Sequence, residues 1–305
     1  MSRLVFIFFL TGFFTVSAGI GESIERSLCN LETMVYGQVR LNESLESRFS
    51  RLETIIFGKD FHENNLDIRL TRLMKPFDFD ESGTISLVAK INYLEWKLSS
   101  RCSDLPLLTK VSRLKKQTQG DNTLNDPLIF EVGKLCAVVF EGSDLEIQYI
   151  RLPENFELKA VLRTDLSSRH SRKDQLLEME LKTAVSTGEI LIFPSGTTIR
   201  GKIGRAKRAE LMGKNGRLNL VLEQILDLGN RECSLKLEQL GFTEDDKTGM
   251  AAGATLIGLA AFGPVGAVGG LFVKGKDVEL KRGTEFILKV DIPDSVPGIR
   301  LKARE

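Results

Sequence analysis

The sequence contains few of the residues that most often carry catalysis and metal binding. It has two His, one Trp and three Tyr in 305 residues. His62 lies in a connector and His170 in a polar turn, so we expect both to be solvated. No G-x-S-x-G, H-E-x-x-H, phosphate-loop or dinucleotide fingerprint is present. We therefore expect a protein that is not an enzyme and uses no cofactor or metal, although a pair of distant carboxylates would leave no motif.

The sequence also lacks an excess of either charge. Its 42 Lys and Arg residues face 41 Asp and Glu residues, which gives no general attraction for nucleic acid, and nucleic acid is not an expected partner. One segment after the Pro194-Ser195-Gly196 turn is locally basic, and it contains Arg200, Lys202, Arg205, Lys207 and Arg208. This pattern indicates either a loop that binds an anionic ligand, such as lipid headgroups or a wall polymer, or a solvated hairpin tip.

Cysteine is scarce, and its spacing excludes the usual zinc motifs. The four cysteines are Cys29, Cys102, Cys136 and Cys233, and no two of them form a C-x-x-C pair. Residues 1–18 read as an export signal, with Arg3, an apolar run over 4–16 and small residues before Gly19; an uncleaved anchor is the alternative. We expect an exported protein of the periplasm, outer membrane or cell surface. The cysteines would then form disulfides in one of three pairings or remain isolated thiols.

The first third of the chain contains an internal repeat with a constant period. The same pair of positions recurs at a constant spacing, as Leu31-Glu32, Leu52-Glu53, Leu73-Met74 and Leu94-Glu95. Apolar residues recur within each copy at intervals of three and four, which predicts short helices with Glu and Arg directed outward. Gly37 and Gly58 suit the position after a helix. Four such helices in residues 19–104 are expected to pack on one another or on a partner.

These copies resemble the short R-L-x-x-L-E-x-x-x-F-G repeats of exported bacterial proteins, most fully in residues 48–58. The resemblance covers roughly residues 24–97 and implies an envelope setting, without a known chemistry. The third and fourth copies depart from it, with Met74 in place of Glu in the third and no Phe-Gly ending. Residues 78–85 match the start of an EF-hand loop, but Ala89 occupies the position of the bidentate Glu, so we expect a connector and not a calcium site.

The pattern changes in the middle of the chain. Residues 105–126 are polar and contain Pro and Gly, which predicts a linker. Beyond it, apolar residues alternate as in strands, for example over 156–162 and 286–290. The expected fold is α+β, with N-terminal short-helix repeats followed by a small mainly-β barrel or sandwich in residues 127–295 and a tail at 296–305.

The predicted strands and turns occur in a particular order. This order resembles the barrel domain of the core-complex subunit of conjugative type IV secretion systems, over residues 156–168, 190–201, 217–229 and 281–291. The resemblance implies a barrel with an insertion that reaches the outer membrane. Phe193 interrupts the family's L-I-P-x-G-T pattern, and the helical repeats stand where that family has a proline-rich arm and an inner-membrane anchor. A shared barrel in another envelope task is the safer implication.

A long uncharged stretch lies near the C-terminus. Residues 248–273 include no charged residue, and they contain seven glycines and Pro264. We expect an apolar insertion at 249–273. Small residues allow close approach in a membrane or against a neighbouring copy, and the contact residues would be Gly249, Gly253, Gly258, Gly263, Gly266 and Gly270. The Gly263-Pro264 break equally allows a soluble glycine-rich insertion, and low-complexity disorder is a third possibility.

Together these features predict an exported assembly or scaffold protein of the cell envelope. Its expected partners are an envelope protein or further copies of itself, with membrane contact through the glycine-rich stretch. The first alternative is a soluble periplasmic module that binds an anionic envelope polymer through the basic segment. The second is a channel component like that of type IV secretion systems.

Overall fold

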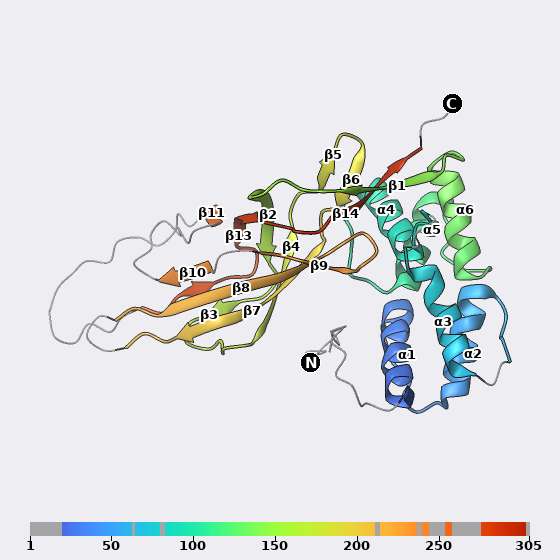
Figure 1. Cartoon of the computed structure of the whole chain (residues 1–305), viewed down its shortest axis with the longest axis horizontal. Helices are drawn as coiled ribbons and strands as arrows, with labels where there is room; N and C mark the ends of the chain where they lie inside the picture. Colours follow the sequence, from blue (N-terminus) through green and yellow to red (C-terminus); the bar gives the residue numbers. More distant parts are fainter. Residues whose placement is uncertain are drawn as a thin grey trace. The chain divides into compact units, whose positions relative to one another are not determined.

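The chain folds into two compact units. The computed structural model describes residues 20–62, 65–79, 83–210, 214–236, 240–243, 254–257 and 276–302. The helical unit contains the described parts of Met1–Leu98 and Asp104–Asp144, and the β unit contains those of Ser99–Ser103 and Leu145–Ala303. Helices precede a curled antiparallel sheet, so the α+β class expected from the sequence is confirmed (Figure 1).

The helical unit is built from short helices at regular spacing. They are α1 (Ile20–Tyr36), α2 (Leu45–Phe57), α3 (Leu66–Met74), the 3-10 turn η1 (Lys75–Phe77), α4 (Leu87–Ser99), α5 (Leu107–Gln119) and α6 (Leu128–Val139). The starts of α2, α3 and α4 are equally spaced, and the same step separates the starts of α5 and α6. The repeat predicted from the apolar spacing is therefore a real repeat of helices.

Local residues define the ends of these helices. The Ser44 hydroxyl accepts a hydrogen bond from the N–H of Ser47 at 3.2 Å, and the Asn65 side chain caps α3 in the same way. Gly58 follows α2 with φ 78°, and its N–H donates to Thr54 at 2.8 Å. Glycine adopts this left-handed conformation without strain, so the predicted use of Gly58 after the helix is confirmed.

The linker predicted at residues 105–126 is wrong, because this segment contains α5. Pro106 and Pro127 immediately precede α5 and α6, where the fixed φ of proline suits a helix start. The step from the start of α4 to that of α5 is one position shorter than the repeat, which hides the register in the sequence. The predicted boundary at residue 127 is also wrong, since α6 belongs to the helical unit.

The β unit contains three groups of antiparallel strands. The largest is an eight-stranded sheet in which β7 and β8 form a long hairpin (Figure 1). Its strands are β10 (Leu240–Thr243), β8 (Arg217–Leu226), β7 (Thr198–Lys207), β4 (Leu176–Leu181), β2 (Phe156–Leu162), β13 (Glu285–Val290) and β11 (Ala254–Ile257), in this order, with β9 (Glu232–Ser234) paired to β8. Its curl makes a half-barrel over the described residues, in agreement with the expected mainly-β unit.

Smaller sheets complete the unit. One contains β1 (Leu145–Ile150), β14 (Val296–Leu301), β6 (Ile190–Phe193) and β5 (Val185–Thr187), and the other pairs β12 (Glu279–Leu280) with β3 (Leu166–Ser167). The tail predicted at 296–305 is therefore wrong over most of its length, because β14 pairs with β1 along its whole length. This strand begins with Val-Pro-Gly, and because proline and glycine are uncommon inside strands the sequence did not predict it. Its first four residues are nevertheless buried.

The core of the β unit is built from side chains of several strands. It contains the fully or almost fully buried side chains of Phe193, Phe286, Met179 and Leu220, which come from four strands. Of these strands, β4, β8 and β13 alternate buried and more exposed residues, as the sequence pattern predicted. Truncating Phe286 to Ala would cost about 3–5 kcal/mol by lost burial and an unfilled cavity.

The Pro194-Ser195-Gly196 turn forms hydrogen bonds with residues 100–102 of the chain. The N–H of Cys102 donates to the carbonyl of Ser195 at 2.8 Å, and the Ser195 hydroxyl donates to the carbonyl of Ser100 at 2.5 Å. Gly196 has φ 84°, and a Cβ there would lie 2.1 Å from the Cys102 carbonyl oxygen. Glycine is required twice, once by the backbone conformation and once by this contact.

Candidate functional site

The helical unit is held together by buried ion pairs that follow the repeat. Arg48 of α2 donates to both carboxylate oxygens of Glu32 of α1, at 3.0 and 2.7 Å. Arg69 of α3 makes the same two bonds to Glu53 of α2, at 2.9 and 2.8 Å, and both side chains are fully buried. The second pair lies one repeat after the first. The sequence-based prediction that these Glu and Arg residues point outward is therefore wrong.

Two further contacts complete each pair. Arg48 also donates to the Cys29 sulfur and Arg69 to the Ser50 hydroxyl, both at 3.2 Å. The carboxylates accept a backbone N–H from the following loop, from Arg40 at 3.3 Å in the first pair and Phe61 at 3.1 Å in the second. We call each such group, a carboxylate and a cation buried between successive helices, a clamp. Its hydrogen bonds offset the desolvation that burial of both charges requires.

These contacts also explain the ionisation of the clamp cations. Hydrogen bonds from Arg48 to Glu32 and from Arg69 to Glu53 raise the pKa of each guanidinium further above its usual value, and this effect outweighs burial. Arginine is charged at neutral pH in any case, and these contacts favour its charged form further.

A third clamp joins α4 to α5 with lysine in place of arginine. The Lys110 ammonium lies 2.9 Å from a carboxylate oxygen of Glu95 and donates to the Asn92 amide oxygen at 2.7 Å. Asn92 occupies the repeat position of Cys29 and Ser50, three positions before the carboxylate. All three clamps so far have the carboxylate on the earlier helix and the cation on the later one.

The clamp between α5 and α6 has the opposite polarity. Lys115 occupies the position on α5 that carries Glu in α1, α2 and α4, and it donates to Glu131 of α6 at 3.0 Å. The same Glu131 oxygen accepts the N–H groups of Asn125 and Asp126, at 2.9 and 3.1 Å. Burial alone would raise the pKa of Glu131, but the bonds from Lys115 and from these two N–H groups outweigh it and lower the pKa.

The junction between α3 and α4 follows a different pattern. The repeat places Met74 at its carboxylate position and Lys90 at its cation position. Met74 carries no charge, so these two positions cannot form a clamp. The sequence change from Glu to Met in the third copy therefore removes the carboxylate that a clamp at this junction would need.

Glycine and proline form a second repeated contact. Gly37, after α1, faces Pro106 before α5, and a Cβ on the glycine would lie 2.4 Å from the proline Cγ. Gly58, after α2, faces Pro127 before α6 at the same distance. Correspondingly, α1 contacts α5 and α2 contacts α6 (Figure 1). The helices therefore wind so that each of the first two lies against the fourth helix after it.

The last helix has exposed apolar side chains. Phe130 and Val138 of α6 are 60% and 53% exposed. Gly133 and Ala137 lie between them and are also exposed. The spacing places these residues on one side of the helix, and we call them the α6 strip. Lys134 lies between Phe130 and Val138 on the same side of the helix, at four-residue spacing from each, and forms an ion pair with Asp126.

The five basic residues predicted to form an anionic-ligand loop lie on β7 or directly after it. The prediction of a loop is wrong for Arg200, Lys202, Arg205 and Lys207, which belong to the strand. Arg200 pairs with Glu232 at 3.1 Å, Lys202 with Glu223 at 2.5 Å and Lys207 with Glu210 at 3.2 Å. Arg205 and Arg208 are exposed. Much of the positive charge noted in the sequence is therefore balanced by neighbouring carboxylates.

The six glycines predicted to contact membrane or a neighbouring copy lie outside the described residues. They are Gly249, Gly253, Gly258, Gly263, Gly266 and Gly270. Within the same stretch, β11 (Ala254–Ile257) pairs with β13. Among the described residues, no helix has the length and apolar character needed to cross a bilayer.

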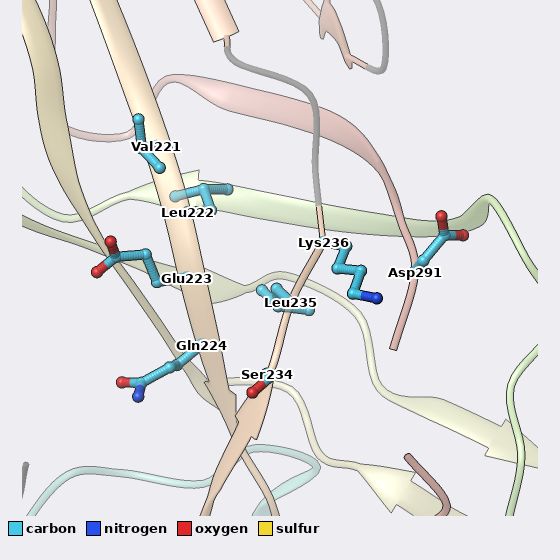
Figure 2. A pocket seen from close by; sticks show the side chains of 8 residues that line it. All are labelled: Val221, Leu222, Glu223, Gln224, Ser234, Leu235, Lys236 and Asp291. Carbon is cyan, nitrogen blue, oxygen red and sulfur yellow. The ribbon is translucent and has the colours of Figure 1, made fainter. Parts of the chain in front are cut away.

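A shallow groove of about 710 Å³ lies in the β unit (Figure 2). It is lined by Val221, Leu222, Glu223, Gln224, Ser234, Leu235, Lys236 and Asp291. Its two carboxylates are already engaged, since Glu223 pairs with Lys202 and Asp291 accepts the N–H of Asn155 at 2.5 Å. Lys236 and Asp291 are joined through their backbones by hydrogen bonds of 2.8 and 2.9 Å. These contacts are structural, and we assign no chemistry to the groove.

The remaining candidate residues have ordinary environments. His62 and His170 are exposed, and His62 lies 3.6 Å from Asp60. All four cysteines are free thiols; burial raises the pKa of Cys136 to about 11 and that of Cys233 to about 12. Over the residues that the structure describes, no cluster of His, Cys, Asp and Glu could hold a metal ion. Part of the EF-hand-like segment, residues 80–82, lies outside the described residues.

Comparison with known proteins found no matching family, no matching curated protein and no matching solved structure.

Proposed function

We propose that this chain is an exported assembly or scaffold protein of the cell envelope, and that the helical unit is its docking element. The observation that carries this proposal is the α6 strip, which places exposed apolar side chains at the end of an array fastened by buried clamps. Exposed apolar side chains that gather on one side of a helix are a feature of many interaction sites. A rigid helix face also loses little conformational entropy when it binds.

The setting of this function rests on the sequence. The signal-like residues 1–18 and the resemblance of the first repeats to exported bacterial proteins both support export. The half-barrel of the β unit is also suited to an envelope protein, because small barrels serve many binding and structural roles. None of these supports a particular reaction, and the proposed role is structural.

The experiment is fractionation of cells that express the full-length chain, followed by alkaline carbonate washing, N-terminal sequencing and native electrophoresis. We expect an N-terminus at Gly19 and recovery in an envelope complex larger than the monomer. Val138→Asp should remove the protein from that complex. Leu176→Asp, on an equally exposed side chain of β4, should not. A chain that retains Met1 and stays in the cytoplasm as a monomer would contradict the proposal.

A second candidate function uses the end of β7. Arg205 and Arg208 are exposed there, beside Lys207, which supports weak binding of an anionic envelope polymer. Replacing Arg205 and Arg208 by Ser should lower the affinity for such a polymer, and more strongly at low salt, because exposed charges are screened by ions. An affinity that is unchanged and independent of salt would exclude this role.

A further inference from the structure

We propose that the end of the β7–β8 hairpin binds the surface of a membrane that contains anionic lipids. The site is a group of exposed basic residues at this end of the hairpin, which we call the cationic face. Its members are Arg205, Lys207, Arg208, Lys214 and Arg217. This inference goes beyond the docking role of α6, and for the end of β7 it names a bilayer as the partner in place of a dissolved polymer.

The pairing of β7 with β8 places three of these cations on one face of the sheet. Lys207 is directly opposite Arg217 in the register, and Arg205 lies two positions before Lys207 on the same strand. Their neighbours Ala206 and Leu218 pack into the core of the β unit. Successive side chains of a strand point to opposite faces, so the three cations point away from the core. Because all three are exposed, they form one positive surface.

Glu210 and Asp277 bring negative charge to this end of the hairpin, and both carboxylates are already engaged. Glu210 forms ion pairs with Lys207 at 3.2 Å and with Lys214 at 3.7 Å. An oxygen of Asp277 accepts the N–H of Ala209 at 2.7 Å. One carboxylate is therefore shared between two of the five cations, and the other is directed to the backbone.

Three arginines of the cationic face have no such partner. Over the described residues, no carboxylate lies within ion-pair distance of Arg205, Arg208 or Arg217. The opposite half of β7 differs, since Arg200 and Lys202 pair with carboxylates of neighbouring strands. Within the part of the chain that the structure describes, uncompensated positive charge is therefore concentrated at one end of this strand.

The opposition of Lys207 and Arg217 has a cost for the fold. Like charges directly opposite each other on neighbouring strands destabilise a sheet. Glu210 offsets only part of this cost, because it is shared with Lys214. Proteins keep destabilising arrangements where binding requires them. At the proposed site, lipid phosphates would supply the missing negative charge.

The neighbouring parts of the chain favour a bilayer over a dissolved polymer. The strand β10 lies beside β8 and ends at Thr243, opposite Arg217 (Figure 1). The chain returns at Lys276, whose carbonyl accepts the N–H of Gly216 at 2.9 Å. The sequence between these two points contains the uncharged stretch 248–273, which is therefore tethered on both sides to the cationic face.

A bilayer offers a partner for both of these features. Its anionic headgroups attract basic residues near the surface, and its interior accepts uncharged apolar residues. Binding to a membrane surface becomes stronger when apolar burial and electrostatic attraction act together. A polyanion in water supplies only the charge.

The experiment is sedimentation of residues 19–305 with lipid vesicles. One set contains phosphatidylcholine alone, and the other contains phosphatidylcholine mixed with phosphatidylglycerol, which is anionic. We expect the protein to bind the anionic vesicles much more strongly than the neutral ones. This preference should decline as salt is added, because exposed charges are screened by ions.

A triple variant tests the cationic face itself. It replaces the three arginines that have no carboxylate partner among the described residues, as Arg205→Gln, Arg208→Gln and Arg217→Gln. We expect its affinity for the anionic vesicles to fall at least about tenfold, because each basic residue near such a surface adds to the attraction. Its thermal unfolding should occur no earlier than that of the parent chain, since the opposed charges at positions 207 and 217 are removed.

The matched control removes the same number of exposed cations from the helical unit. It is the triple variant Arg26→Gln, Arg113→Gln and Lys116→Gln, on α1 and α5. The change in net charge is identical, so general attraction of the whole protein to the vesicles falls equally in both variants. We expect the control to keep the affinity of the parent chain.

Several results would overturn the inference. A chain that binds neither kind of vesicle, or binds both kinds equally, does not use a cationic face to bind lipid. Equal losses in the two triple variants would show an effect of net charge alone. An affinity that the arginine variant leaves unchanged would also exclude the site. This last result is expected if the acidic run Glu244-Asp245-Asp246, which lies outside the described residues, neutralises the face.

The test also separates this inference from the functions proposed above. Binding of soluble polyphosphate without binding of anionic vesicles would overturn the membrane contact and leave the polymer-binding function standing. The docking role of α6 is measured independently, by the effect of Val138→Asp on the envelope complex. Loss of that complex from Val138→Asp, together with no binding to vesicles, would overturn the membrane contact alone.

Discussion

Lys115 of α5 donates a hydrogen bond to Glu131 of α6, so in this clamp the cation lies on the earlier helix and the carboxylate on the later one. The preceding clamps have the opposite order. The exchange leaves α5 with two buried lysines, one directed to α4 through Lys110 and one to α6. A helix with a carboxylate at the position of Lys115 cannot take the place of α5 without burying two carboxylates together on the α6 side. Clamp polarity therefore distinguishes α5 from the other helices.

Breaking a clamp should be costly. Arg69→Met leaves the Glu53 carboxylate buried without its cation, and we expect the free energy of unfolding to fall by about 3–5 kcal/mol in urea titrations. The double variant Glu53→Leu and Arg69→Met should regain much of this loss, because no charge is then buried. Arg26→Met, at an exposed residue of α1, is the control. Equal stabilities of Arg69→Met and the control would show that the buried pair contributes little.

The polarity of the last clamp can be tested by exchange. Lys115→Glu should destabilise the protein strongly, since it places two buried carboxylates together. Adding Glu131→Lys should recover only part of the stability. The new lysine pairs with Glu at position 115 but cannot accept the N–H groups of Asn125 and Asp126, which Glu131 satisfies. A double-mutant cycle in urea measures the coupling, and additive effects would contradict the assigned contact.

The glycine after α2 should tolerate no side chain. Gly58→Ala combines a positive φ of 78° with a Cβ 2.4 Å from the Pro127 ring. We expect a loss of roughly 2 kcal/mol or more, from backbone strain of about 1–2 kcal/mol and the added clash. Gly120→Ala is a matched control, because Gly120 has the same φ of 78° and an added Cβ meets nothing within 4 Å. Thermal unfolding of both variants separates the two causes, and equal losses would exclude the contact with Pro127.

The helical unit should lose stability in acid through Glu131. Its pKa is lowered in the folded protein below the ordinary value of 4.5. The unfolded chain therefore binds the proton more tightly, and this contribution is complete above pH 4.5 and is lost as the pH falls through the folded pKa. Glu131→Gln should be less stable near neutral pH and should show a shallower decline in acid. Parallel curves of stability against pH for the two proteins would contradict the assignment.

The sequence predicted the parts of the fold that depend on local pattern. The apolar spacing of three and four identified the helices of the first repeats, and alternation identified strands such as Phe156–Leu162. The turn at Pro194-Ser195-Gly196 was also identified, because proline and glycine there have direct conformational reasons. These predictions needed no knowledge of which segments meet.

The predictions that failed depended on distant contacts or on a shifted register. Glu53 and Arg69 were expected to be exposed because charged residues usually are, and only their pairing across two helices makes burial tolerable. The shortened step between the starts of α4 and α5 concealed α5 behind Pro106. The step from Pro106-Leu107 to Pro127-Leu128 equals the period of the repeat, and this signal could have revealed both missed helices.

The residues of the candidate site could also be predicted only in part from the sequence. Its exposed apolar residues, Phe130 and Val138, could not be distinguished in the sequence from core residues of an amphipathic helix. Their exposure follows from the position of α6 at the end of the array, where no following helix of the described chain covers them. The basic residues were visible in the sequence, but the carboxylates that balance Arg200 and Lys202 come from neighbouring strands.

The contacts of Gly37 with Pro106 and of Gly58 with Pro127 have a consequence for how the helical unit unfolds. In a linear array each repeat touches only its neighbours, and the ends can melt while the middle persists. Here the first helix contacts the fifth and the second contacts the sixth, so loss of either end removes support from the other. The helices α1 to α6 should therefore melt in a single transition, and the unit should not be divisible into shorter stable fragments.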